Sequence, residues 1–167
     1  MWVLSASAAV VALDQLTKYF VRQNFALYES VSVLGTFFRL TYVENSGIVF
    51  GIGVGTALPL FTFLSLGATA LILYFLYRER FSAFRLRLAL AIVLGGAIGN
   101  AIDRILWSQV ADFFDFGIGP YRFYIFNIAD MAVTVGVGLY LLFEFLETRS
   151  TKAAADSSPA PELSQEA

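Results

Sequence analysis

Histidine and cysteine are both absent from this chain of 167 residues. Nucleophile systems that pair serine or cysteine with histidine therefore cannot be built, and the usual histidine and cysteine zinc sites are excluded as well. Without cysteine there are no disulfides and no thiol chemistry. If the protein is a hydrolase, we expect carboxylates to supply its acid–base chemistry, with no metal and no organic cofactor.

Charged residues are also scarce. They make up 14% of the chain, against about 25% in soluble domains, whereas 58% of the residues are hydrophobic and the mean hydropathy is +0.71. This composition indicates a membrane protein, and the length suggests one compact helical unit. The formal net charge is −2 and no basic stripe is present, which argues against a nucleic-acid partner.

Four segments are long enough to cross a bilayer, which takes about 20 mostly apolar residues per helix. We place them near 2–22, 57–77, 83–104 and 123–146. The first is interpreted as a retained span rather than a signal peptide, because a basic n-region is missing. The predicted fold is therefore an all-α membrane protein with one four-helix domain over 1–149. Residues 150–167 are rich in Ala, Ser, Pro and Glu and are predicted to form a disordered tail.

Arginine placement predicts the orientation. The short loop after the second span carries four arginines, Arg78, Arg80, Arg85 and Arg87. The positive-inside rule makes this loop cytoplasmic, and four spans then place both termini and the tail in the cytoplasm. The outer segments run over about 23–56 and 105–122. Alternating polar and apolar residues in the first predict a small extracytoplasmic β element within about 30–51, followed by a turn at Asn45–Gly47.

Asp14 and Lys18 lie four residues apart in the first span, so they share one helical face and can pair. An ionisable group at membrane depth is costly and by default suggests a functional site. An aspartate beside a lysine is, however, poorly suited to proton exchange. We therefore favour a structural ion pair here.

The densest motif is Gly95–Arg104 at the end of the third span. Gly95 and Gly99 are small enough to let helices approach closely. Asn100, Asp103 and Arg104 follow on a neighbouring polar face. A structural Asp103–Arg104 network and a functional one are equally compatible with this pattern.

Asp112 and Asp130 are the remaining candidates. Asp112 lies in the second outer segment, where, taken alone, it is predicted to be a solvated loop acid like Asp115. Asp130 instead enters the fourth span with an apolar run behind it, and Asn127 stands one turn before it. A carboxylate there needs partners. The residues that can converge at its level are Asn100, Arg104, Asp112 and Asn127.

Two carboxylates within hydrogen-bonding range share a proton, because ionising both at once costs free energy through the repulsion between their charges. One member can activate water while the other protonates the carbonyl oxygen or the leaving amine. Asparagine amides and an arginine can orient the peptide, and Asn45 is a further candidate for this role. A rival pairing of Asp103 with Asp130 stays open, because both lie on helices whereas Asp112 is predicted on a loop.

Five blocks carry a resemblance to a known family. They are Asp14–Lys18, Asn45–Gly51, Gly95–Arg104, Val110–Phe113 and Phe126–Asp130. With these five blocks in this order, the chain resembles the lipoprotein signal peptidases, also called signal peptidase II. The resemblance implies a multi-pass aspartic endopeptidase of the bacterial inner membrane with its site toward the outer face. It would act as a monomer on lipid-modified prolipoproteins among membrane lipids, cutting before the diacylglyceryl-modified cysteine.

The resemblance also assigns roles. Asp112 and Asp130 match the family's catalytic dyad, Asp14 and Lys18 match a supporting pair, and Asp103 becomes scaffold. The positions that would bind or support the substrate are Asn45, Gly47, Asn100, Arg104 and Asn127. Four residues depart from the family pattern. Ile48 and Val49 are bulky. Tyr124 stands where proline is common, and Met131 stands where a small polar residue is common.

Two other classes of protein compete with this interpretation. A small proton-coupled transporter or channel would use Asp14, Asp103 and Asp130 as relay groups, but a relay predicts acids spread through the membrane. Here Asp103, Asp112 and Asp130 gather toward one face. A purely structural membrane subunit would leave the convergence of polar groups unexplained.

Overall fold

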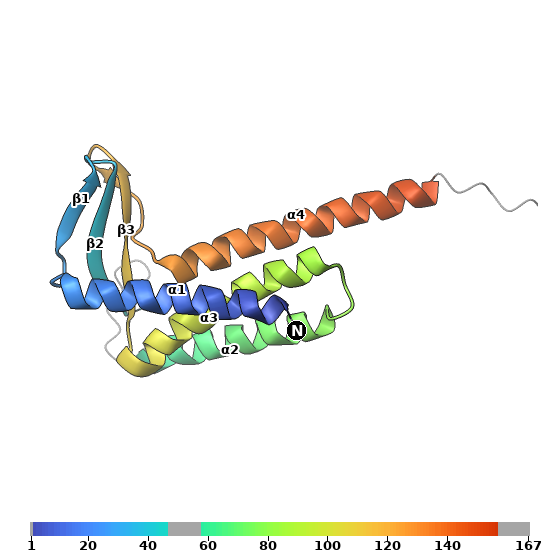
Figure 1. Ribbon diagram of the computed structural model, residues 1–167, viewed down its shortest axis with the longest axis horizontal. Helices are drawn as coiled ribbons and strands as arrows, with labels where there is room; N and C mark the ends of the chain where they lie inside the picture. The colour runs from blue at the N-terminus through green and yellow to red at the C-terminus, as the bar shows by residue number, and fades with distance from the viewer. Residues whose placement is uncertain (1, 47–57, 157–167) are drawn as a thin grey trace, which may run out of the picture.

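The computed structural model describes residues 2–46 and 58–156. Four helices run side by side, and a small sheet stands across one end of them (Figure 1). The helices are α1 (Val3–Asn24), α2 (Leu58–Arg78), α3 (Phe84–Trp107) and α4 (Ile128–Asp156). The strands are β1 (Ser30–Leu34), β2 (Phe38–Asn45), β3 (Val110–Ile118) and β4 (Tyr121–Arg122).

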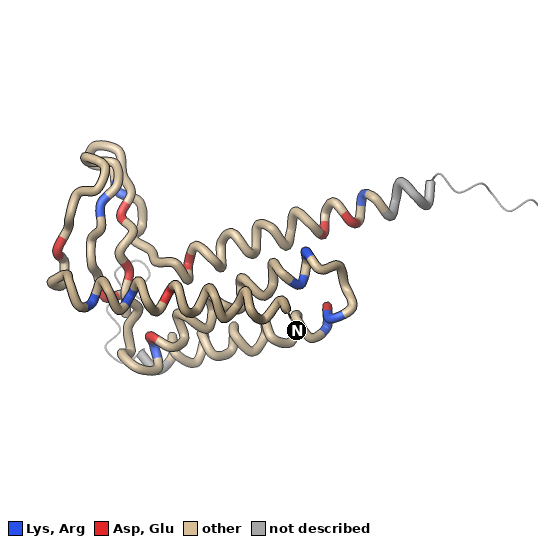
Figure 2. Tube along the Cα trace, in the orientation of Figure 1, with Lys and Arg blue, Asp and Glu red and all other residues tan. Residues whose placement is uncertain are grey.

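Three of the helices are long and apolar enough to cross a membrane, over Leu60–Arg78, Phe84–Trp107 and Ile128–Ser150. α1 falls outside this group because Asp14, Gln15 and Lys18 interrupt its apolar run. Figure 2 shows that charged residues gather toward the two ends of the helices. The predicted architecture of four helices with a small β element is confirmed, and three of the four helices qualify as membrane spans by length and composition.

α3 is the central helix, since 56% of its apolar span is buried, compared with 17% for α4 and none for α2. Glycine makes this possible. A Cβ atom on Gly99 would lie 2.5 Å from Oδ2 of Asp14 on α1, and one on Gly96 would collide with the backbone oxygen of Ala129 on α4. The close helix packing predicted for this motif is present.

The sheet is antiparallel with the order β1-β2-β3-β4. Its central pair places Val43 opposite Asp112 and Asn45 opposite Val110. Tyr42 and Phe113 are buried against the end of α1. Each predicted outer segment contributes two strands, so the β element is larger than the single region predicted over 30–51.

Several boundaries differ from the predictions. α4 begins at Ile128 rather than near 123, because Phe126 forms a bridge with Phe114 of β3 and holds the preceding residues extended. α4 also continues to Asp156, so 150–156 are helical where disorder was predicted. Residues 157–167, and with them the rest of the predicted tail, lie outside the described residues. Gly47, Ile48 and Val49 also lie outside the described residues.

Candidate active site

Asp112 lies on strand β3 and is 1% exposed. The prediction of a solvated loop acid is therefore wrong, as it is for Asp115, which is 6% exposed. Both are buried because β3 pairs along its length with β2. Asp115 is neutralised by Arg122 at 2.7 Å and accepts a hydrogen bond from Thr41 at 2.7 Å. Asp112 has no cation bonded to it within the described part of the chain.

Asp130 lies in the first turn of α4, where the helix start holds it in place. The side-chain oxygen of Asn127 accepts a hydrogen bond from the backbone N–H of Asp130 at 2.9 Å. In return, Oδ2 of Asp130 accepts the backbone N–H of Asn127 at 3.2 Å. This reciprocal pair is a capping box. It orients Oδ2 of Asp130 and leaves Oδ1 to accept a hydrogen bond from Asn100 on α3.

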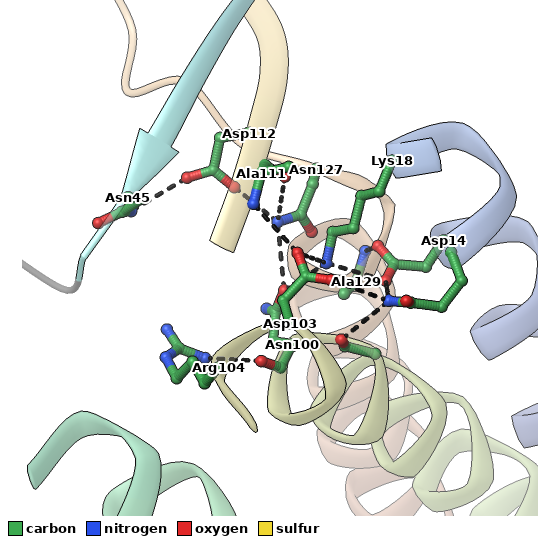
Figure 3. A network of polar contacts seen from close by, with 12 residues as sticks. Asp14, Lys18, Asn45, Asn100, Asp103, Arg104, Ala111, Asp112, Asn127 and Ala129 are labelled. Carbon is green, nitrogen blue, oxygen red and sulfur yellow. Dashed lines mark hydrogen bonds and ion pairs between the residues drawn. The ribbon is translucent and has the colours of Figure 1, made fainter. Parts of the chain in front are cut away.

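Asparagine amides donate to both aspartates, and Figure 3 shows Asn45 and Asn127 directed at Asp112. Nδ2 of Asn127 donates to Oδ1 of Asp112 at 2.6 Å, while Asn45 donates to Oδ2 of the same carboxylate at 3.0 Å. Asn100 donates to Oδ1 of Asp130 at 2.7 Å. Of the residues predicted to converge, Asn100 and Asn127 bond to the aspartates, and both oxygens of each aspartate receive an N–H donor.

The electrostatics favour a protonated Asp112. Burial, and secondly the nearby charge of Asp130, raise the pKa of Asp112 to about 7. Hydrogen bonds from Asn45 and Asn127 and the charge of Lys18 act in the opposite direction. A carboxyl group with a pKa near neutrality can both take and give a proton at physiological pH. This is the property expected of an acid–base group.

Tyr124 joins this cluster, although the sequence marked it only as a departure from the family pattern. Its hydroxyl contacts the amide of Asn45. Burial and the charges of Asp112 and Asp130 raise the pKa of Tyr124. The hydroxyl therefore stays protonated and can act as a donor.

Asp103 is fully buried and is surrounded by donors from outside its own helix. It accepts from Arg22 at 3.0 Å and from the backbone of Ala111 at 3.1 Å, and it lies 3.3 Å from Nζ of Lys18. The predicted Asp103–Arg104 network is wrong, because adjacent residues on a helix point in different directions. Arg104 is half-buried and contacts the backbone oxygen of Asn100 at 3.4 Å.

Asp14 and Lys18 form the ion pair that their spacing predicts, at 2.9 Å with both side chains fully buried. Asp14 also accepts the backbone N–H of Ala129 at 2.9 Å, next to Asp130. Two residues of this cluster were missed in the sequence, Gln15 and Arg22. Arg22 was recognisable, because it continues the four-residue spacing from Asp14 through Lys18.

A cavity of about 490 Å³ lies against α4 beside Asp130. Its lining residues are Phe123, Tyr124, Phe126, Asp130, Met131, Thr134 and Val135. The wall is mainly apolar with one carboxylate, the composition typical of a pocket in which a few polar groups orient a bound molecule. Among the described residues, no cluster of three or more carboxylates is arranged to hold a metal ion.

Comparisons with known proteins identify the family of this chain. The model of the family described as Signal peptidase (SPase) II matches residues 6–146. The lipoprotein signal peptidase of Syntrophus aciditrophicus is 40% identical over 154 residues, covering 90% of this chain and 95% of the relative. That of Pasteurella multocida is 39% identical over 142 residues, covering 83% and 86%.

A solved structure described as a "Bacterial membrane enzyme structure by the in meso method at 2.3 A resolution" has a TM-score of 0.74 and 32% identity, covering 90% of each chain. The shared fold therefore extends over the helices and the sheet together. The family resemblance carried by the five sequence blocks is confirmed. This chain belongs to the signal peptidase II family, and its relatives are multi-pass bacterial membrane enzymes.

Proposed function

We propose that this protein removes signal peptides from diacylglyceryl-modified prolipoproteins, with Asp112 and Asp130 as its catalytic dyad. As a member of its family, the chain is an aspartic endopeptidase. The dyad assignment rests on one observation: Asn127 donates to Asp112 with its side chain and to Asp130 with its backbone. One residue thus holds two carboxylates from different elements in a common site.

The chemistry follows from a pair that shares one proton. The ionised carboxylate removes a proton from water, and the water oxygen attacks the carbonyl carbon of the scissile peptide bond. The protonated carboxyl group donates its proton to the carbonyl oxygen. When the tetrahedral intermediate collapses, the C–N bond breaks and the carboxyl group that took the water proton donates it to the leaving nitrogen. A hydroxyl group of the intermediate returns its proton to the other carboxylate as the carbonyl re-forms. The dyad returns to its one-proton state.

The surrounding amides support this cycle. Asn45, Asn100 and Asn127 each donate to the dyad, so these amides orient the carboxylate oxygens. Arg104 lies one helical turn beyond Asn100 and contributes positive charge near the substrate site. Gly47, outside the described residues, belongs to the same proposed substrate-binding group through its sequence block.

The rival pairing of Asp103 with Asp130 has less support. Asp103 is bonded to two cations, Lys18 and Arg22, so its negative charge is already compensated. The transporter interpretation weakens for the same reason, since it needs Asp14 and Asp103 as exchangeable relay groups. Both instead take part in a buried ion network.

The cavity beside Asp130 supports a lipid-modified substrate. Part of its apolar wall, Met131 and Val135, lies on α4, a helix long and apolar enough to cross a membrane. Acyl chains can therefore remain in the bilayer while the peptide segment occupies the cavity.

The orientation is also part of the proposal. Arg78 and Arg80 at the end of α2 lie at the opposite end of the molecule from the sheet (Figures 1 and 2). The positive-inside rule assigns that end to the cytoplasm. Both termini then lie in the cytoplasm and the dyad lies toward the outer face, where a translocated prolipoprotein presents its cleavage site.

Cleavage of a diacylglyceryl-modified precursor by purified variants tests the dyad. We expect Asp112→Asn and Asp130→Asn each to lower kcat by about a thousandfold or more. A cooperative thermal melting curve should show that each variant is still folded. Asp115→Asn is the matched control, because it removes a buried carboxylate from the same strand without touching the dyad. Full cleavage by either dyad variant would overturn the assignment.

A further inference from the structure

Lys18 is a buried cation that the proposed chemistry does not use. Its side chain is 0% exposed, and its three acceptors are Asp14 Oδ2 at 2.9 Å, Asp103 Oδ2 at 3.3 Å and Asn100 Oδ1 at 2.9 Å. A protonated lysine has three N–H donors and no acceptor. Each donor therefore has a partner, and two of the partners are carboxylates that already neutralise the charge.

The third contact is the informative one. A lysine can only donate, so the group of Asn100 that faces Lys18 must be the carbonyl oxygen. The NH₂ group of Asn100 then points the other way, toward Oδ1 of Asp130 at 2.7 Å. If the amide of Asn100 were rotated, its NH₂ would oppose the ammonium group and its oxygen would oppose the carboxylate. Both contacts would be repulsive.

Asn127 adds a second constraint in the same sense. Its Nδ2 lies 3.2 Å from Oδ1 of Asn100, so this oxygen accepts from two sides. The orientation of Asn127 is itself set by its oxygen, which accepts the backbone N–H of Asp130. Figure 3 shows Lys18, Asn100 and Asn127 lying together between the helices.

We infer that Lys18 is a positioning residue for the catalytic dyad: by occupying the carbonyl oxygen of Asn100, it directs the NH₂ group of Asn100 to Asp130. The inference rests on the proposed dyad and adds a residue that acts through another. Within the described part of the chain, Lys18 bonds to Asp14, Asp103 and Asn100 and reaches the dyad only through Asn100. Its charge also lowers the pKa of Asp112, against the effects of burial and of Asp130.

A double-mutant cycle separates this role from simple charge compensation. Lys18→Met alone leaves Asp14 buried without its cation, which endangers folding. Lys18→Met is therefore made together with Asp14→Asn, which removes both members of the ion pair. Arg22 still compensates Asp103. The same pair of substitutions is then made in an Asn100→Ala background, and all variants are first shown to be folded by their melting curves.

The expected result is a loss of kcat that depends on Asn100. Lys18→Met with Asp14→Asn should lower kcat at least about tenfold, with KM nearly unchanged, because the NH₂ group of Asn100 is then no longer directed to Asp130. In the Asn100→Ala background the same pair of substitutions should change kcat less than about twofold. Equal losses in both backgrounds, or a folded variant with normal kcat, would overturn the inference.

A second variant covers the case in which Lys18→Met does not fold. Asn100→Asp keeps an oxygen for Lys18 but replaces the NH₂ donor to Asp130 with an acceptor. We expect a loss of kcat of similar size, and normal cleavage by folded Asn100→Asp would contradict the inference. If Asp130→Asn is inactive while these variants are normal, only the role of Lys18 fails. If Asp130→Asn is active, the proposed dyad itself fails.

Discussion

The side-chain amide of Asn127 donates to Oδ1 of Asp112 at a distance of 2.6 Å. This contact joins the first turn of α4 to strand β3. It also lowers the pKa of Asp112, opposing the effects of burial and of Asp130. The relationship between these two residues therefore controls both the position and the protonation of the proposed dyad.

Asn127→Ala should reduce catalysis more than stability. The variant loses a hydrogen bond to a carboxylate, which contributes about 1.5–3 kcal/mol and corresponds to a tenfold to hundredfold fall in kcat. It also loses the α4 cap, at about 1 kcal/mol of folding free energy. Single-turnover cleavage and thermal melting measure the two effects. Asn24→Ala, at the exposed end of α1, is the control and should leave kcat unchanged.

The pH–rate profile should have a basic limb near pH 7. The pair is active with one proton bound, and Asp112, whose pKa is raised to about 7, loses that proton as the pH rises through this value. At low pH the second carboxylate becomes protonated and the rate falls again. Asp115→Asn should leave the basic limb in place. A rate that stays constant between about pH 6 and pH 9 would contradict a proton-sharing pair.

The same shift makes folding stability depend on pH. The folded protein holds the Asp112 proton more tightly than the unfolded chain does, because the pKa is raised from 3.8 to about 7 on folding. This contribution is complete below about pH 4 and is lost as the pH rises through about 7. The wild-type melting temperature minus that of Asp112→Asn should therefore be larger at pH 5 than at pH 8. The reverse order would rule out the raised pKa.

Gly99→Ala should disrupt the junction of α1 and α3. Its Cβ atom would lie 2.5 Å from Oδ2 of Asp14, so the buried ion pair with Lys18 has to move. We expect a loss of about 2 kcal/mol or more in folding free energy, measured by denaturant or thermal unfolding. Gly67→Ala in α2 is the matched control. Nothing lies within 4 Å of its Cβ position, and alanine should be neutral or stabilising there.

Arg122→Gln should destabilise the sheet. It removes the cation that lies 2.7 Å from Asp115 and leaves a buried carboxylate without compensation, at a cost of about 1–3 kcal/mol. Arg85→Gln breaks an ion pair with Glu147 in which both side chains are partly exposed, and it should change stability by less than about 1 kcal/mol. Equal losses in the two variants would show that burial of Asp115 is unimportant.

Much of the fold follows from local patterns. Apolar runs of helical length predict the four helices, and the spacing of Asp14 and Lys18 predicts their ion pair. The glycines of α3 predict close packing, which Gly99 realises against Asp14. These features depend on residues near one another in the chain, so their spacing is sufficient.

The parts that were predicted wrongly depend on distant contacts. Asp112 and Asp115 follow α3 in what resembles a loop, but β2, about 70 residues earlier, pairs with this segment and buries both. Asp103 was placed with its neighbour Arg104, whereas its cations, Lys18 and Arg22, come from α1. No local period carries this information.

By itself, the sequence determined the class of protein. Its composition indicates a membrane protein, and the lack of histidine and cysteine leaves carboxylates as the groups expected to carry out acid–base chemistry. The order of its motifs also identified the family. Beyond the Asp14–Lys18 pair, only the tertiary structure decided which acids are compensated by cations and which are held by amides. That distinction requires α1, α3, β3 and α4 to meet, since the protonation of a buried carboxylate is set by the neighbours that folding brings to it.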